Sequence, residues 1–238
     1  GTVVQQQRQI IALGGGGFPI ESENLSLERF ILEQAHVPNP AVCLLPTARG
    51  DADSYVVRFY DAFSKLACRP SHISLFQRTP DLRSYIFHQD VIYVGGGNTK
   101  SMLGVWREWG IPGLLKEAYE SGIVLAGTSA GAICWFGQGV TDSFADKLSV
   151  LDCLGFLQGS CCPHYDSEPE RKPAYHNLLL NGEIYPGIAI DNSVAVHFLE
   201  GEISQIVASR PEGKAYLVRA INGTVMEDPF AVEYIGVP

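Results

Sequence analysis

Several features are absent from this 238-residue sequence, and each absence narrows the class of protein. Basic residues never form a run longer than a pair and the formal net charge is −9, so we expect neither nucleic acid nor an anionic membrane surface as a partner. No apolar stretch approaches the ~20 residues that a membrane span needs, and the N-terminal GTVVQQQRQ lacks the apolar core of a secretion signal. The expected location is therefore the cytoplasm.

Motifs for metals and cofactors are missing as well. The six cysteines show no C-x-x-C spacing, and most lie in or beside apolar runs, where a free cysteine usually acts as a small hydrophobe. Cys161 and Cys162 stand beside His164, but neighbouring side chains project in different directions and no second pair completes a metal site. A dinucleotide fingerprint that starts at Gly14 would need its third glycine where Pro19 stands. We therefore expect no metal and no cofactor.

The first 140 residues alternate short apolar segments with amphipathic ones, at a spacing typical of βαβ units. This pattern predicts an α/β fold, with a mostly parallel central sheet and helices on both faces. We expect strands at 9–13, 41–45, 71–76, 91–94 and 124–126, and helices at 26–36, 54–67, 82–87 and 112–121, with a further helical stretch that ends at 106. Glycine-rich turns follow three of these strands and should share the sheet edge where ligands gather.

The pattern changes after residue 140. Residues 148–159 are apolar without a clear period, and one helix is expected at 174–180. Short strands are then predicted at 187–190, 193–199, 203–208, 215–219 and 224–226, with hairpin turns between several of them. We expect these strands to form a short antiparallel extension of the same sheet. No Pro/Ser-rich linker divides the chain, so residues 1–238 are expected to form a single domain.

The segment from Gly127 to Gly131 has the spacing G-x-S-x-G and follows an apolar strand, which is the pattern of a nucleophile elbow. The two glycines remove side chains that would collide in the tight turn presenting Ser129. The next helix directs its first amides, beginning with that of Ala130, toward any negative charge beside the serine. The alternative is a plain strand-to-helix joint without chemistry.

A serine hydroxyl becomes a good nucleophile only when a base within ~3 Å takes its proton. Of the six histidines, His164 is the best candidate, because Pro163 stiffens its approach, a polar loop follows it and it comes after the serine in the chain. The other five have adequate structural explanations in helices and strands: His36, His72, His88, His176 and His197.

The ordered set GTSAGA, GGGN and PHY resembles the dipeptidase E and cyanophycinase family of serine peptidases, from the glycines after the first strand to the DNSVAV segment. The resemblance implies a fold like that of class I glutamine amidotransferases. It also implies Ser129 as nucleophile, His164 as general base, and an oxyanion hole made by the amide of Ala130 with that of Gly96 or Gly97.

The third member of the catalytic group departs from this pattern. The family often has a glutamate in a segment D-E-x-x-A, where this sequence has Asn192. An asparagine can orient an imidazole but stabilises an imidazolium less well than a carboxylate does. We rank Asp142, in VTDSF, ahead of Asn192, and Asp166 is a third candidate. Asp191 is adjacent to Asn192 but would point to the other face of a strand.

Members of the resembled family cleave after aspartate in small peptides, and Arg171 could pair with such an acidic P1 side chain. The alternative reading of Arg171 is a solvated charged loop. We expect a serine peptidase of the dipeptidase E type that hydrolyses small peptides through an acyl-enzyme, with homodimer formation left open. Two other functions remain: a non-catalytic relative that binds a peptide or amino acid, favoured by Asn192, and an esterase or amidase on non-peptide substrates.

Overall fold

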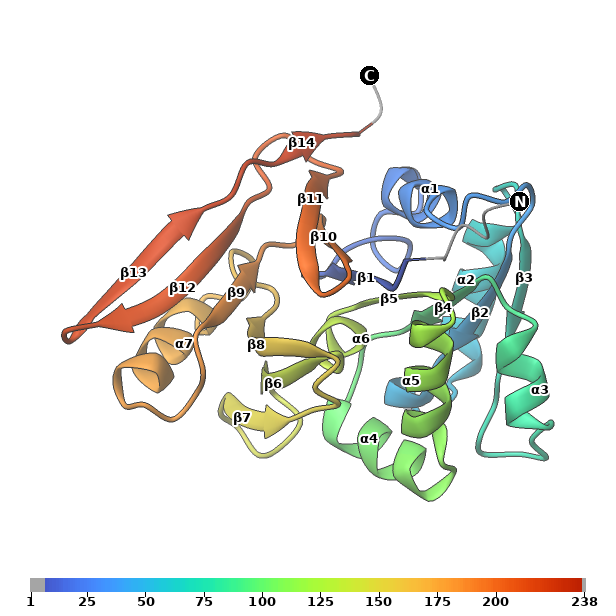
Figure 1. Ribbon diagram of the computed structural model, residues 1–238, viewed down its shortest axis with the longest axis horizontal. Coiled ribbons are helices and arrows are strands. Elements are labelled where there is room, and N and C mark those ends of the chain that lie inside the picture. Colours follow the sequence, from blue (N-terminus) through green and yellow to red (C-terminus); the bar gives the residue numbers. More distant parts are fainter. Residues whose placement is uncertain (1–6, 237–238) are drawn as a thin grey trace.

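The computed structural model describes residues 7–236, which form two β-sheets flanked by helices (Figure 1). The strands of the first sheet are β1 (Gln9–Leu13), β2 (Ala41–Leu45), β3 (Arg69–His72), β4 (Val91–Val94), β5 (Val124–Thr128), β10 (Val194–Leu199), β11 (Glu202–Ala208) and β14 (Glu233–Tyr234). Their order in the sheet is β14-β11-β10-β1-β5-β4-β2-β3. The segment from β1 to β3 is parallel throughout, and β10 and β11 extend it in antiparallel pairing, as the sequence predicts.

Helices cover both faces of the first sheet, because the side chains of each strand alternate between two apolar clusters. In β1, Ile11 and Leu13 pack with helices α1 (Ser26–Glu33) and α2 (Asp53–Phe63), which lie together on one face. Ile10 and Ala12 pack in the cluster of the opposite face, with helices α3 (Leu82–Phe87), α4 (Thr99–Glu108) and α5 (Ile111–Glu120). The predicted arrangement of a parallel sheet between two helical layers is therefore confirmed. None of the helices in residues 7–236 is long and apolar enough to cross a membrane.

The second sheet was not predicted from the sequence. Its strands are β6 (Phe136–Thr141), β7 (Ser149–Asp152), β8 (Leu157–Cys162), β9 (Gly187–Ile190), β12 (Ala215–Ile221) and β13 (Thr224–Pro229), in the order β13-β12-β9-β8-β6-β7. Helix α7 (Arg171–Leu180) packs on it through Tyr175 and Leu179. The expectation that all of the C-terminal strands extend the first sheet is wrong for β9, β12 and β13, which pair with β8 and with one another instead.

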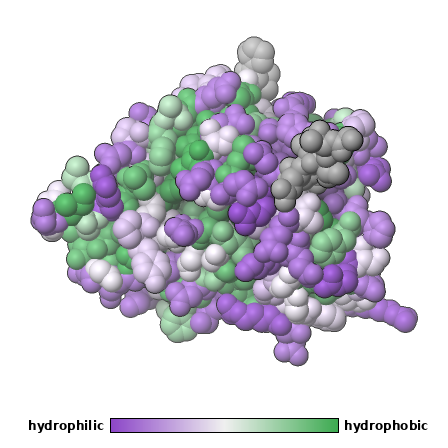
Figure 2. Space-filling view, viewed as in Figure 1, coloured by the Kyte–Doolittle hydropathy of each residue, from purple (hydrophilic) through white to green (hydrophobic). Residues whose placement is uncertain are grey.

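The two sheets share one apolar cluster. Phe136, Leu157 and Ile188 of the second sheet belong to the same cluster as Ile10 and Leu125 of the first. On the face seen in Figure 2, hydrophobic side chains are more frequent over the second sheet than over the helices beside the first. The chain passes between the sheets at two places that matter for function: from β5 through the short helix α6 (Ala130–Ile133) into β6, and from β9 into β10.

Candidate active site

Ser129 occupies the turn between β5 and α6, where its backbone adopts φ 56° and ψ −108°. This turn requires glycine on both sides. A Cβ on Gly127 would lie 2.3 Å from the carbonyl oxygen of Gly131, and one on Gly131 would lie 2.0 Å from that of Val94. Any larger side chain at these positions would push β4, β5 and α6 apart, so the G-x-S-x-G spacing is what allows the serine to be presented here.

His164 lies against this serine. Its Nε2 is 2.7 Å from Oγ of Ser129, and both residues are half-buried. His164 follows β8 of the second sheet and adopts a positive φ of 52°. The backbone N–H of His164 donates to the carbonyl oxygen of Gly14 at 2.7 Å. The next residue, Gly15, leaves room for the imidazole ring, since a Cβ on it would lie 2.6 Å from that ring. The glycine turn after β1 therefore holds and accommodates the histidine of the other sheet.

Asn192 completes a series of three hydrogen-bonded side chains. Its Oδ1 is 2.7 Å from Nδ1 of His164. Because an amide oxygen can only accept, Nδ1 carries the ring proton and Nε2 is left to accept the hydroxyl proton of Ser129. This is the tautomer that a general base needs. The neighbouring Ser193 donates its N–H to the carbonyl oxygen of Gly15 at 3.0 Å, so the same glycine turn also fixes the segment that carries Asn192.

The ranking of Asp142 ahead of Asn192 is wrong. Asp142 follows the end of β6, its side chain is 67% exposed, and its carboxylate lies 4.0 Å from the guanidinium of Arg171 rather than beside His164. Asp191 does point away from the imidazole, as expected, and accepts the N–H of Lys214 at 3.0 Å. Burial, together with the nearby Asp166, raises the pKa of Asp191 to about 6.

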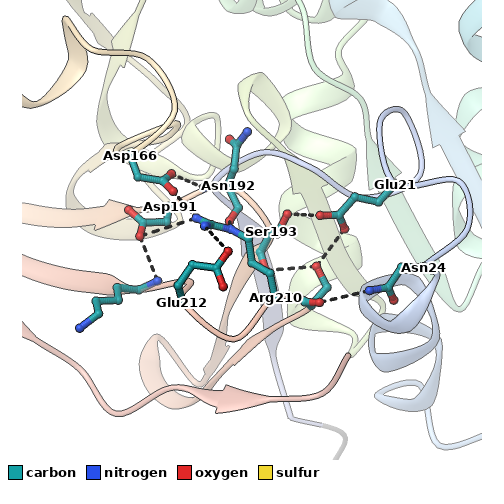
Figure 3. Close-up of polar contacts among 10 residues, drawn as sticks. Glu21, Asn24, Asp166, Asp191, Asn192, Ser193, Arg210 and Glu212 are labelled. Atoms are coloured by element: carbon teal, nitrogen blue, oxygen red, sulfur yellow. Dashed lines mark hydrogen bonds and ion pairs between the residues drawn. The ribbon is translucent and has the colours of Figure 1, made fainter. Parts of the chain in front are cut away.

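Asp166 does not contact the imidazole either. Its Oδ1 accepts the backbone N–H of Asn192 at 2.9 Å, and its Oδ2 pairs with Arg210 (Figure 3). The candidacy of Asp166 for the third position is therefore wrong, and Arg210 was missed as part of the site. Arg210 has no local signal, since it reaches the site from the turn after β11.

The candidate donors of the oxyanion hole differ in their present partners. Gly96 lies beside Ser129, and a Cβ on it would be 3.4 Å from Cβ of the serine. However, its N–H donates to Oη of Tyr55 at 3.4 Å, and burial raises the pKa of that phenol to about 12, so it stays neutral. The amides of Gly97 and Ala130 have no acceptor within residues 7–236. The geometry therefore favours Gly97 and Ala130 over Gly96.

The expectation that Arg171 meets the substrate is wrong. Its side chain is only 3% exposed, because it extends from the first turn of α7 to the backbone of β6. The guanidinium donates to the carbonyl oxygen of Val140 at 2.7 Å and to Glu168 at 2.7 Å. A buried cation needs such partners, and they leave Arg171 unavailable to a ligand.

A second buried group lies under the glycine turn after β1. Glu28 of α1 is fully buried, its Oε1 accepts the N–H of Phe18, and its Oε2 has no hydrogen-bond partner in the described part of the chain. Burial raises the pKa of Glu28 to about 7. Sequence reasoning missed this carboxyl group, because a glutamate in an amphipathic helix is expected to face solvent.

A serine on a strand-to-helix turn, hydrogen-bonded to an imidazole that a third group orients, is the arrangement of hydrolases that act through a covalent intermediate. The chain belongs to peptidase family S51, whose family model matches residues 10–206. The resemblance to the dipeptidase E and cyanophycinase family that the motifs indicate is therefore confirmed.

Individual relatives agree with this membership. A Bacillus subtilis (strain 168) protein named Uncharacterized peptidase YgaJ is 52% identical over 230 residues, covering 96% of this chain and 100% of that protein. Uncharacterized peptidase Lin0382 of Listeria innocua serovar 6a is 26% identical over 148 residues, covering 58% of this chain and 71% of that protein. The crystal structure of a peptidase from an acI-B1 Actinobacterium has the same fold, with a TM-score of 0.73 and 17% identity over 96% of both chains.

Proposed function

We propose that this protein is a serine peptidase that hydrolyses small peptides through an acyl-enzyme. Ser129 is the nucleophile, His164 the general base and Asn192 the group that orients the imidazole. The observation that carries the proposal is the pair of 2.7 Å contacts that join Ser129 Oγ to His164 Nε2 and His164 Nδ1 to Asn192 Oδ1. Membership of a peptidase family supports peptides as the substrates.

The reaction proceeds in two halves. As Oγ of Ser129 attacks the peptide carbonyl carbon, Nε2 of His164 takes the hydroxyl proton and later gives it to the leaving amine. The oxyanion accepts hydrogen bonds from the amides of Ala130 and Gly97, each of which contributes about 3 kcal/mol to the stability of the tetrahedral intermediate. Water then hydrolyses the acyl-enzyme by the same proton transfers in reverse. Asn192 holds the ring but adds no negative charge to balance the imidazolium.

We also propose a preference for substrates that carry a carboxylate near the scissile bond, and we assign it to Arg49 in place of Arg171. Arg49 is exposed, and its Cγ would lie 2.9 Å from a Cβ on Gly97. Its guanidinium lies 5.3 Å from the centre of the Tyr55 ring and has no ion pair or hydrogen bond within residues 7–236. A guanidinium in this position can bind a carboxylate through two parallel hydrogen bonds.

A fluorophosphonate probe tests the nucleophile. The wild-type protein should be labelled on Ser129, and Ser129→Ala should abolish labelling while the circular dichroism spectrum stays unchanged. If folded wild-type protein is not labelled, the site has a binding role, which is the alternative that Asn192 favours. If the protein is labelled but cleaves p-nitrophenyl esters and no peptide, the esterase alternative replaces the peptidase.

A substrate panel tests Arg49. Arg49→Gln should lower kcat/KM for carboxylate substrates by about 10–100-fold, because a charge-assisted pair is lost, and should leave uncharged substrates unchanged. Comparing Asp-X with Asn-X locates the carboxylate at P1, and comparing free with amidated C-termini locates it at the chain end. The matched control is Arg58→Gln, an exposed cation on α2. Equal losses for charged and uncharged substrates would refute the assignment.

A further inference from the structure

The backbone of Asn192 is bound at both of its polar groups. Its N–H donates to Oδ1 of Asp166 at 2.9 Å, and its carbonyl oxygen accepts from Nε of Arg210 at 3.0 Å. Figure 3 shows Asp166 and the guanidinium of Arg210 together beside the backbone of Asn192. Such a pair of contacts leaves the peptide units on both sides of Asn192 little freedom to rotate.

Asp166 and Arg210 also bind each other, through Oδ2 and Nη2. The three residues therefore form a closed ring whose members come from three distant segments: the loop after β8, the connection between β9 and β10, and the turn after β11. Asp166 stands on the same loop as His164, two residues further along. The ring thus links the loop that carries the base to the segment that carries the group orienting it.

We propose that Asp166 and Arg210 are positioning residues that act on His164 through Asn192, an inference that rests on the proposed function. A carboxylate in the third position can offer either of two oxygens to Nδ1, but an amide has one oxygen, and the Nδ2 of Asn192 has no partner within residues 7–236. The orientation of Asn192 therefore depends on how firmly its backbone is held. Misplacement of a catalytic group by about 1 Å can cost about 100-fold in rate.

The alternative is a structural ion pair that only stabilises the fold. The side chains of Arg210 and Asp166 are 26% and 32% exposed, and pairs with this much access to water contribute little to folding. The guanidinium also lies 3.2 Å from Glu212 and 3.9 Å from Asp191, so it would keep carboxylate partners without Asp166. Only Asp166 among these carboxylates also binds the backbone of Asn192.

A double-mutant cycle on peptide hydrolysis separates the two roles. Arg210→Ala should lower kcat by about 10–100-fold with KM nearly unchanged, because an orientation is lost and no substrate contact is. In an Asn192→Ala background the same change should cost less than about 2-fold, since there is no orienting amide left to position. Equal losses in both backgrounds, or no loss in either, would overturn the proposal.

Two further variants define which contact matters. Asp166→Asn keeps an oxygen for the N–H of Asn192 but loses the ion pair, so its effect should be smaller than that of Asp166→Ala, which loses both contacts. Glu212→Gln is the matched control, because it removes a carboxylate from Arg210 without touching Asn192, and kcat should stay within about 2-fold of wild type. A Glu212→Gln effect as large as that of Arg210→Ala would assign the losses to Arg210 electrostatics in general.

The Nδ1–H proton of His164 offers a readout that does not depend on turnover. In nitrogen-15-labelled protein this proton should exchange slowly with solvent, and its resonance should be shifted downfield by the hydrogen bond to Asn192. Arg210→Ala should broaden this resonance while the other resonances remain those of folded protein. An unchanged resonance in Arg210→Ala would refute the positioning role. Because fluorophosphonate labelling tests the nucleophile separately, failure of the proposed function and failure of this inference give different results.

Discussion

The two sheets contribute different parts of the candidate site. The first sheet supplies Ser129, the glycine turns and the amides that would bind an oxyanion, all at the carboxyl ends of β1, β4 and β5. The second sheet supplies His164 at the end of β8 and leads from β9 into the segment with Asn192. The proposed nucleophile therefore lies on the parallel first sheet, and the groups proposed to activate it come from the second sheet. The site exists only where the two layers meet.

The largest expected effect tests whether the two layers work as one unit. Ser129→Ala and His164→Ala should each lower kcat by at least about 10⁴-fold, and the double variant should lose no more than the worse single one, because neither group acts without the other. Steady-state kinetics on a peptide substrate provide the measurement. If the loss in kcat of the double variant equals the product of the two single losses, the two sheets contribute independently.

A smaller effect concerns the neutral third group supplied by the second sheet. Asn192→Ala should lower kcat by about 100-fold, because the imidazole loses the partner that fixes its tautomer. Asn192→Asp should raise kcat and move the acidic limb of the pH profile to higher pH, since a carboxylate 2.7 Å from Nδ1 favours the protonated ring. A downward shift of that limb would contradict the proposed contact.

The buried carboxyl group beneath the first sheet should make stability depend on pH. The folded-state pKa of Glu28 is raised from 4.5 to about 7. The contribution of the protonated carboxyl group to the free energy of unfolding is therefore fully present below pH 4.5 and is lost as the pH rises through 7. The loss amounts to roughly 3 kcal/mol. Urea titrations should show this decline between pH 4.5 and about 7 in wild type and a flatter profile in Glu28→Gln. An identical slope in both proteins would assign the pH dependence elsewhere.

The smallest expected effect is that of Asp142, which the sequence favoured as the third catalytic group. Asp142→Ala should change kcat by less than about 2-fold, because the carboxylate is exposed and lies near Arg171 rather than His164. The same kinetic assay as for Asn192→Ala gives the comparison. A loss as large as that of Asn192→Ala would reverse the assignment of the third group.

The first sheet could be predicted because its signals are local. The central strands β1, β2, β4 and β5 are short, mainly apolar runs that are fully buried, the helices on its two faces have their own apolar stripes, and the spacing of Gly127, Ser129 and Gly131 is contained in five residues. The second sheet escaped prediction because β6 (FGQGVT) and β8 (LQGSCC) carry glycines and show no sustained alternation. Their strand character comes from pairing with each other and with β9, which residue patterns do not encode.

The errors at the site have the same origin. Asp142, Asp166 and Asn192 are all polar residues beside strand ends, and only the path of the chain between the sheets decides which of them reaches His164. Arg171 begins a helix in a charged stretch, which indicated an exposed side chain, but its guanidinium donates to the carbonyl oxygen of Val140. Ser129 and His164, which the motifs bring forward as a pair, do lie in contact.

The division of Ser129 and His164 between two layers also bears on how the protein would lose activity under stress. The two sheets share an apolar cluster, yet the proposed proton transfer between them depends on a single 2.7 Å contact at their boundary. A small displacement of one sheet relative to the other would break that contact while every strand stayed paired. Inactivation by heat or urea should therefore precede the loss of secondary structure.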